Sequence, residues 1–233
     1  MDAQQLHDHI TKLDERVRRS SQKSQYGNSD ILVLAVSKTK PAEDIRAAHA
    51  AGLSHFGENY LQEALAKIEA LSDLELTWHF IGPLQSNKTR AVAEHFDWVH
   101  TVDREKIARR LSQQRPPHLA PLNVCLQVNI SGESTKSGVS LGELPDLAAR
   151  VSDLPGIALR GLMTIPAPAG EGQDEEARRR PFRALREAFE ALQAGCPEMD
   201  TLSMGMSADL EAAIAEGATI VRIGTALFGE RER

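Results

Sequence analysis

Short apolar runs that alternate with amphipathic segments are the feature that most limits how this chain can fold. Each run is too short for a helix and predicts a buried β-strand, and each is followed by a helical segment or a helical turn. Strands that alternate with helices in this way indicate a parallel sheet. The predicted strands are Ile31–Val36, Leu53–Gly57, Thr77–Gly82, Trp98–Val102, Leu122–Ile130, Ile157–Ile165, Asp200–Met204 and Ala218–Ile223.

Helical periodicity and capping residues predict helices before, between and after these strands. They are an N-terminal helix with Leu6, Ile10, Leu13 and Val17 on one face, Pro41–Ala51, Glu58–Leu71, Asn87–His95, a helix capped by Asp103 that runs to about Gln114, Leu144–Val151, one with Phe182, Leu185, Phe189 and Leu192 on one face, Ser207–Glu216, and a short turn at Thr225–Gly229.

Eight strand–helix units in 233 residues predict an α/β fold, in the form of a single (β/α)8 TIM-type barrel with an additional N-terminal helix. We expect one domain over residues 1–233, in which residues 1–29 form the N-terminal helix and a loop and residues 30–229 form the barrel. A doubly wound open sheet is the alternative.

Composition narrows the class of protein. The formal charge is −6, from 27 Lys and Arg against 33 Asp and Glu, and aromatic residues make up 4%, which argues against a nucleic-acid partner. The longest purely apolar run, Ile31–Val36, is too short for a membrane helix, and the N-terminus has no apolar signal core. Cys125 and Cys196 belong to no metal-binding or disulfide pattern. We therefore expect a cytoplasmic protein with no metal.

Reactive residues of a (β/α)8 barrel lie at the carboxyl ends of its strands. The first predicted strand ends in SKTKP, where a desolvated lysine would act as a nucleophile toward an aldehyde. A solvated loop lysine is the commoner case. Lys38 and Lys40 have the same strand parity, but Lys40 precedes Pro41 and belongs to the loop, which favours Lys38.

Two neighbouring strand ends have the composition of a phosphate site. Gly205 allows close backbone approach and Ser207 begins a predicted helix, whose free N–H groups favour an anion. Gly224 and Thr225 repeat this arrangement after the last strand. The alternative is that Ser207 only caps its own helix.

Arg222 and His79 are two candidate functional residues that lie inside predicted strands. The side chain of Arg222 points either into the barrel or into the helix layer. A buried arginine needs a partner, so Arg222 either pairs with a carboxylate of a helix or donates to a ring nitrogen or acid of a bound molecule. His79 is more typical of a hydrogen-bonded core residue than of a functional one.

Seven ordered blocks over residues 31–229 carry a resemblance to a known family. They are AVSKTKP, HFGENYLQE, WHFIGPLQSNK, VNISGESTKSG, GLMTIPAP, TLSMGMSADLEAAI and VRIGTALFG. The chain resembles the pyridoxal phosphate homeostasis protein family, which are single-domain, alanine-racemase-like barrels of fold type III that bind pyridoxal 5′-phosphate (PLP).

The resemblance implies a role for each matching residue. Lys38 would hold PLP as a Schiff base, Arg222 would face the pyridine nitrogen, and Asn59 would line the pocket. Ser207, Gly224 and Thr225 would hold the phosphate. A permanently charged guanidinium disfavours protonation of the ring nitrogen, which makes PLP a weaker electron sink.

The implied function is intracellular PLP homeostasis, in which the protein holds and supplies PLP without substantial turnover. The alternative is an amino-acid racemase, which needs a second acid/base group on the other face of the cofactor. Larger alanine racemases take it from an additional domain that we do not expect here. We expect a monomer whose partners are PLP and apo PLP-dependent enzymes, and a transient PLP contact at Lys136.

Overall fold

The computed structural model describes residues 3–26, 30–132, 137–168, 170, 172 and 174–229, and its centre is a closed barrel of eight parallel strands. Each strand pairs with the next, and the barrel closes where β1 pairs with β8, with Leu34 opposite Arg222. The (β/α)8 prediction is confirmed, and the doubly wound alternative is wrong. The strands are β1 Leu32–Val36, β2 His55–Glu58, β3 Thr77–Phe80, β4 Trp98–Val102, β5 Leu122–Gln127, β6 Ile157–Met163, β7 Thr201–Met206 and β8 Ile220–Ile223.

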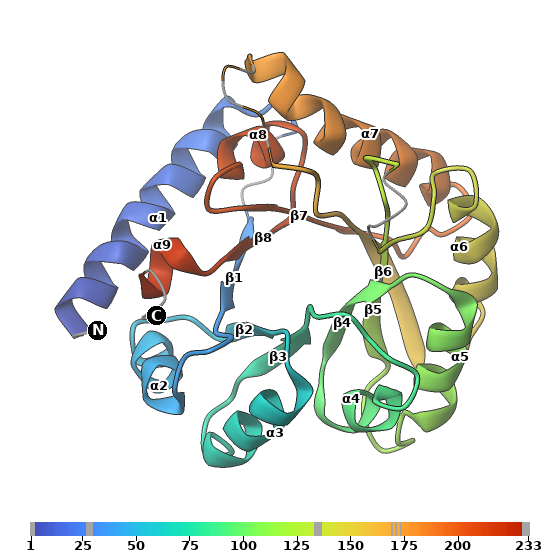
Figure 1. Cartoon of the computed structure of the whole chain (residues 1–233), viewed down its shortest axis with the longest axis horizontal. Helices are drawn as coiled ribbons and strands as arrows, with labels where there is room; N and C mark the ends of the chain where they lie inside the picture. The colour runs from blue at the N-terminus through green and yellow to red at the C-terminus, as the bar shows by residue number, and fades with distance from the viewer. Residues whose placement is uncertain are drawn as a thin grey trace.

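Helices surround the barrel on the outside (Figure 1). The predicted N-terminal helix α1 is confirmed and is longer than its apolar periodicity indicated. It lies against α8 and α9, near the end of the described chain (Figure 1). The helices are α1 Ala3–Lys23, α2 Ala42–Ala50, α3 Leu61–Ala70, α4 Thr89–His95, α5 Glu105–Gln114, α6 Leu144–Ser152, α7 Glu175–Gln193, α8 Leu210–Ala215 and α9 Thr225–Phe228.

Buried apolar side chains form a large layer between strands and helices and a small cluster inside the barrel. The inner cluster is Leu34, Ile81 and Ile220, with Leu32 and Val36 packed against it. Side chains alternate between the two faces of a strand. Lys38 therefore continues the inward row of β1, and Arg222 continues the inward row of β8.

Three predicted boundaries are wrong for identifiable reasons. Glu58 ends β2 instead of beginning a helix, because its buried carboxylate pairs with Lys67 from the helix that follows. Asp103 does not cap α5; its carboxylate accepts a hydrogen bond from Arg104, which takes the N-cap position. The fifth strand stops at Gln127, after which Val128 bridges to Val139 of the following loop.

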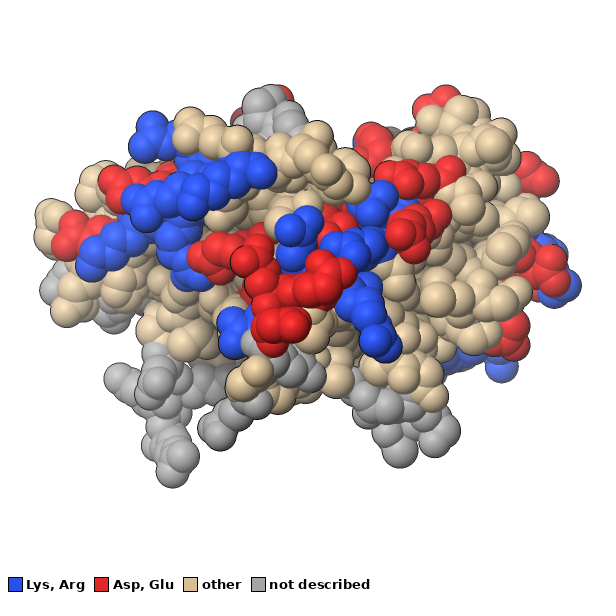
Figure 2. Space-filling model, turned by 90° about the horizontal axis from the view of Figure 1, so that it is seen from above, with Lys and Arg blue, Asp and Glu red and all other residues tan. Residues whose placement is uncertain are grey.

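The surface carries mixed charge. On the face shown in Figure 2, basic and acidic side chains are interspersed. In the described parts of the chain, no helix is both long enough and apolar enough to cross a membrane.

Strands β6 and β7 approach so closely at Gly161 that a methyl group added there should destabilise the fold. A Cβ at Gly161 would lie 1.7 Å from the carbonyl oxygen of Thr201, whereas a Cβ at Gly142 meets nothing within 4 Å. We expect Gly161→Ala to lower the free energy of unfolding by about 1–3 kcal/mol or more, because the backbones of paired strands cannot separate cheaply. Chemical denaturation measures this, with Gly142→Ala as the matched control. Equal stability of the two variants contradicts the close packing.

Candidate functional site

The carboxyl ends of all eight strands meet at one end of the barrel, here called the mouth. Lys38 follows β1, Asn59 follows β2 and Ser207 follows β7, while Gly224 and Thr225 follow β8. The structure therefore brings five of the six predicted binding residues to the mouth. The sixth, Arg222, lies within β8.

The two candidate lysines after β1 have different surroundings. Lys38 is partly buried and continues the inward row of Leu34 and Val36. The Nζ of Lys40 donates to the carbonyl oxygen of Phe228 at 2.9 Å, so this amine is bonded to the end of α9. The contact of Lys40 agrees with the preference for Lys38, whose covalent role stays a prediction.

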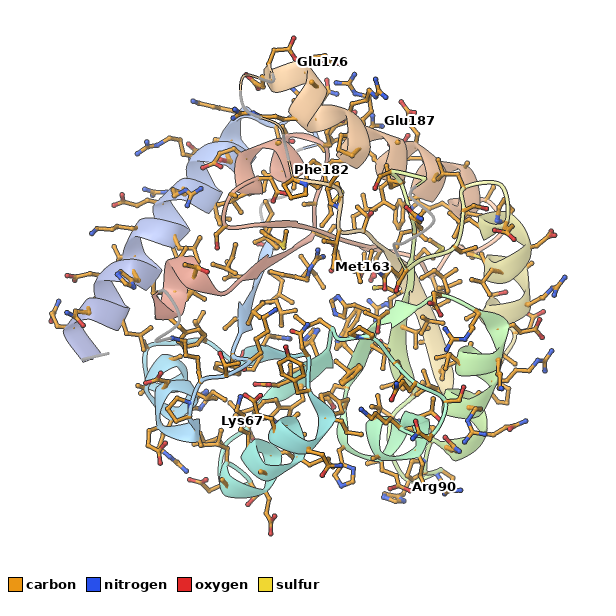
Figure 3. All side chains as sticks on the ribbon, in the orientation of Figure 1. Lys67, Arg90, Met163, Glu176, Phe182 and Glu187 are labelled. Carbon is orange, nitrogen blue, oxygen red and sulfur yellow. The ribbon has the colours of Figure 1, made fainter. Side chains whose placement is uncertain are left out.

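A buried ion pair between Lys67 and Glu58 supports the backbone beside Lys38 from the side of the helix layer. Lys67, on the side of α3 that faces the strands (Figure 3), donates to the Ser37 carbonyl oxygen and to Glu58 Oε1, each at 2.8 Å. Ser37 Oγ also donates to Glu58 Oε1, at 2.6 Å. Burial raises the pKa of Glu58, against the lowering effect of Lys67 and Ser37. The strand end that carries Lys38 is thus fixed from the helix layer.

The residue after Lys38 is fixed as well. Thr39 has a positive φ of 65°, which L-residues rarely adopt, and its backbone N–H donates to the Glu63 carboxylate. Since Lys67 also pairs with Glu63, one buried amine supports the residues on both sides of Lys38.

Arg222 points into the barrel and not into the helix layer, which settles the alternative that the sequence left open. Its guanidinium donates to the carbonyl oxygen and the Oγ of Ser203 at 2.7 and 2.8 Å, and to the carbonyl oxygen of Thr164 at 2.8 Å. The side chain is 4% exposed, and burial lowers its pKa to about 10 while Asp209 and Cys125 raise it. Arg222 is therefore a fixed cation just below the mouth.

A row of histidines continues from Ser203 across the barrel interior. Ser203 Oγ lies 2.8 Å from Nδ1 of His100, and His100 Nε2 lies 2.9 Å from Nδ1 of His79. His79 Nε2 lies in turn 2.9 Å from Nδ1 of His55. His79 is fully buried with both ring nitrogens in contact, which agrees with a hydrogen-bonded core residue.

Ser207 lies before α8 and not at its first residue, so the predicted helix start is wrong. Asp209 takes the N-cap position, and its Oδ1 accepts the Met206 N–H at 2.6 Å. The Asp209 side chain makes no capping hydrogen bond to α8, and Ser207 is partly exposed in the turn at the mouth. Gly205 has a φ of 95°, and a Cβ there would lie 2.6 Å from Ala213 Cβ.

The segment after β8 turns directly into α9. Gly224 takes the N-cap position of α9, and its carbonyl oxygen accepts from the N–H groups of Leu227 and Phe228. Thr225 is exposed at the mouth. The backbone here therefore begins a helical turn beside the end of β1, as the sequence predicted.

The side-chain oxygen of Asn59 accepts no hydrogen bond from the described residues. This atom, Oδ1, is buried. A buried acceptor at the mouth costs free energy unless a donor reaches it. The sequence alone gave no sign of this property.

Sequence reasoning missed the partners of Arg222. Ser203 and Thr164 were not singled out, and neither was His100, which contacts Ser203. Ser203 alternates in sequence with Leu202 and Met204, which pack in the layer between strands and helices, so its parity is inward. A polar residue at an inward position was the available signal. The predicted contact at Lys136 lies outside the described residues.

Comparison with known proteins identifies the class of domain. The family model of the alanine racemase N-terminal domain matches residues 9–232. A pyridoxal phosphate homeostasis protein of Pseudomonas aeruginosa is 60% identical, over 97% of this chain and 95% of the relative. A structure of PipY from Synechococcus elongatus, with PLP bound, is 39% identical with a TM-score of 0.81 and covers 96% of this chain and 100% of that one. This chain belongs to the pyridoxal phosphate homeostasis protein family.

More distant structures share only the fold. Alanine racemase from Corynebacterium glutamicum is 17% identical with a TM-score of 0.71, and the similarity covers 99% of this chain and 62% of that one. The barrel architecture is thus common to racemases and to this family.

Because Lys67 is the buried partner of Glu58, we expect its removal to destabilise the fold strongly. Lys67→Met leaves the Glu58 carboxylate buried without its cation, so we expect the free energy of unfolding to fall by about 3–5 kcal/mol. Arg46→Met, which breaks an exposed pair with Asp73, serves as the control and should change the free energy of unfolding little, because solvent screens an exposed ion pair. Denaturant unfolding compares the two, and similar losses would contradict the supporting role of Lys67.

The buried histidines predict a loss of stability in mild acid. Burial lowers the pKa of His79 well below 6.5 and the pKa of His100 to about 3. The unfolded chain therefore takes up protons below pH 6.5 that the folded chain does not bind. Stability should fall as pH falls from 6.5 toward 5, by up to about 1.4 kcal/mol per pH unit for each histidine. Denaturant unfolding across this range measures the slope; a flat profile contradicts two neutral histidines.

Proposed function

We propose that this chain binds PLP at the barrel mouth, with Lys38 as the covalent attachment point, and that it holds and supplies PLP in the cell without substantial turnover. The names of its close relatives and the PLP-bound PipY structure support the proposal. We further propose that residues 1–233 act as one binding domain, in the cytoplasm and as a monomer, with apo PLP-dependent enzymes as recipients.

The observation that carries the proposal is the fixed orientation of Arg222. Its guanidinium is buried inside the barrel and directed by Ser203 and Thr164. It lies on β8, which Gly224 and Thr225 follow, and this strand pairs with β1, which Lys38 follows. An anionic, ring-shaped ligand at the mouth would meet a cation below it, an amine at one side and the start of a helical turn at another.

The residues at the mouth fit PLP in polarity as well. Asn59 Oδ1 is a buried acceptor that no group in the described part of the chain satisfies, so a ligand or a water can supply the donor. Gly205 has a positive φ and no room for a Cβ, which lets the backbone before Ser207 pack closely against α8. Ser207, Gly224 and Thr225 are the residues we assign to the phosphate.

PLP supplies an aldehyde, whose carbon an unprotonated lysine amine can attack with loss of the carbonyl oxygen as water. The chain contributes the position of that amine, since Lys67 and Glu63 hold the backbone on either side of Lys38. Arg222 contributes a charge that keeps a facing ring nitrogen unprotonated. The second contribution disfavours carbanion chemistry and supports storage over turnover.

A racemase remains the second candidate because the fold is shared with alanine racemase. A two-base reaction needs a second acid/base group above the cofactor. The chain has two tyrosines, of which Tyr26 stacks on Arg186 of α7 and Tyr60 is 55% exposed at the start of α3. Neither is held by a hydrogen bond toward the barrel among the contacts of the described residues.

Borohydride reduction after incubation with PLP tests the binding proposal. We expect one phosphopyridoxyl group on the peptide that contains Lys38, because this lysine lies on the inward row of β1. Lys38→Arg should abolish the adduct, and the matched variant Lys40→Arg should retain it. An adduct that persists in Lys38→Arg, or that forms on another lysine of the unaltered protein, contradicts the assignment.

Exchange of the α-hydrogen separates storage from racemisation. With PLP bound, we expect α-deuterated alanine to keep its label during incubation, because Arg222 weakens the electron demand of the ring. Loss of deuterium at a rate that depends on protein concentration would favour the racemase.

A further inference from the structure

The barrel interior contains a continuous row of polar contacts that the binding proposal does not use. It joins His55 of β2, His79 of β3, His100 of β4, Ser203 of β7 and Arg222 of β8 through four contacts of 2.8–2.9 Å. The His100–Ser203 contact joins strands that are not neighbours in the barrel, so it crosses the interior. The row ends on the residue that we propose to face the cofactor ring.

Burial excludes solvent from most of this row. His79, His100 and Ser203 are fully buried and Arg222 is 4% exposed. Only His55 is partly exposed; it begins β2 and therefore lies toward the end of the barrel opposite the mouth. Burial lowers the pKa of all three histidines, so each imidazole in the row is neutral at pH 7.

Neutral imidazoles restrict the direction of the hydrogen bonds. Each one donates from one ring nitrogen and accepts at the other, so the direction of one link fixes the next. Arg222 can only donate, and its N–H reaches Ser203 Oγ. Two directions then remain for the links between Ser203 and His55.

Only one direction uses the hydroxyl hydrogen of Ser203. If His100 donated to Ser203, then Oγ would accept twice, and its hydrogen would have no acceptor among the contacts of the described residues. If Ser203 donates to His100 Nδ1, every donor has an acceptor as far as His55. Unsatisfied buried donors cost free energy, so the second direction is favoured.

We propose that His100 and His79 are positioning residues, which hold the Ser203 hydroxyl and through it the Arg222 guanidinium by a one-directional chain of hydrogen bonds. In this chain Ser203 Oγ–H donates to His100 Nδ1, His100 Nε2–H donates to His79 Nδ1, and His79 Nε2–H donates to His55 Nδ1. All three imidazoles therefore carry their hydrogen on Nε2. The donation from a cation at one end strengthens the links that follow it.

The consequence concerns the cofactor that we propose for the mouth. With the Ser203 oxygen turned toward Arg222, the guanidinium cannot rotate away from the ring position without losing two bonds to Ser203 and one to Thr164. The inference rests on the proposed function for the ligand, but the direction of the chain is a property of the protein alone. It is therefore tested first without PLP.

The tautomers are read directly by long-range ¹H–¹⁵N correlation spectra of the purified protein at pH 7. We expect His79 and His100 to show the Nε2–H pattern, in which Nδ1 is the unprotonated nitrogen. An Nδ1–H pattern, or a charged imidazole, at either residue overturns the proposal whatever the behaviour of any variant.

Substitutions test the positioning effect. We expect His100→Leu to weaken PLP affinity about tenfold and to shift the absorption maximum of the bound cofactor, since one buried hydrogen-bond partner is lost. His100→Asn places an acceptor near the Nδ1 position and should restore most of the affinity. Ser203→Ala should act like His100→Leu, and the double variant should be no weaker than the single ones, because all remove the same link. His49→Leu, on α2 outside the barrel, is the control.

The outcomes separate this inference from the binding proposal. If Lys38 forms the reduced adduct but His100→Leu, folded and with Arg222 present, binds PLP with unchanged affinity and spectrum, the positioning role is overturned. If no adduct forms in the unaltered protein, the binding proposal fails, while the tautomer measurement still decides the direction of the chain. If His100→Leu does not fold, the wild-type tautomers and the Ser203→Ala variant decide.

Discussion

A guanidinium inside a closed barrel is the constraint on which the rest of this structure depends. An arginine in such a place is tolerated only when its donors meet acceptors, and Arg222 finds them in Ser203 and Thr164. Branched apolar side chains usually fill the interior of a (β/α)8 barrel. Here they fill only part of it, around Leu34, Ile81 and Ile220. The remaining space holds the polar row that leads away from Arg222.

The two basic residues that we assign to the ligand are supported from opposite sides of the sheet. Arg222 is held from inside the barrel by side chains of other strands. The strand end that carries Lys38 is held from outside, where Lys67 of α3 bonds the Ser37 carbonyl oxygen and Glu58. Both supports are buried and hydrogen-bonded, which fixes these two positions of the site. A rigid site suits a protein that holds its ligand, since no part of the support needs to move for binding.

Periodicity explains why the fold could be predicted from the sequence. Strand and helix repeats depend on local patterns of apolar residues. Strand parity put Arg222 on the same face as Ile220 but left open whether that face is the inner one, which the contacts of Arg222 with Ser203 and Thr164 decide. The errors lie where a distant residue decides. Glu58 follows an apolar run and resembles a helix start, but its pairing with Lys67 keeps it in β2. Ser207 resembles a helix cap, but Asp209 occupies that position. His100 and Ser203 are 103 residues apart, so no local pattern could join them.

The central claim is that Arg222 and Lys38 address the same bound molecule from two sides. A crystal structure of the protein after incubation with PLP tests this most directly. The account predicts continuous density from Lys38 Nζ to the cofactor, the phosphate beside Ser207, Gly224 and Thr225, and the Arg222 guanidinium facing the ring nitrogen with its bonds to Ser203 intact. A cofactor bound away from the mouth, or a ring turned so that Arg222 contacts no part of it, would contradict the account.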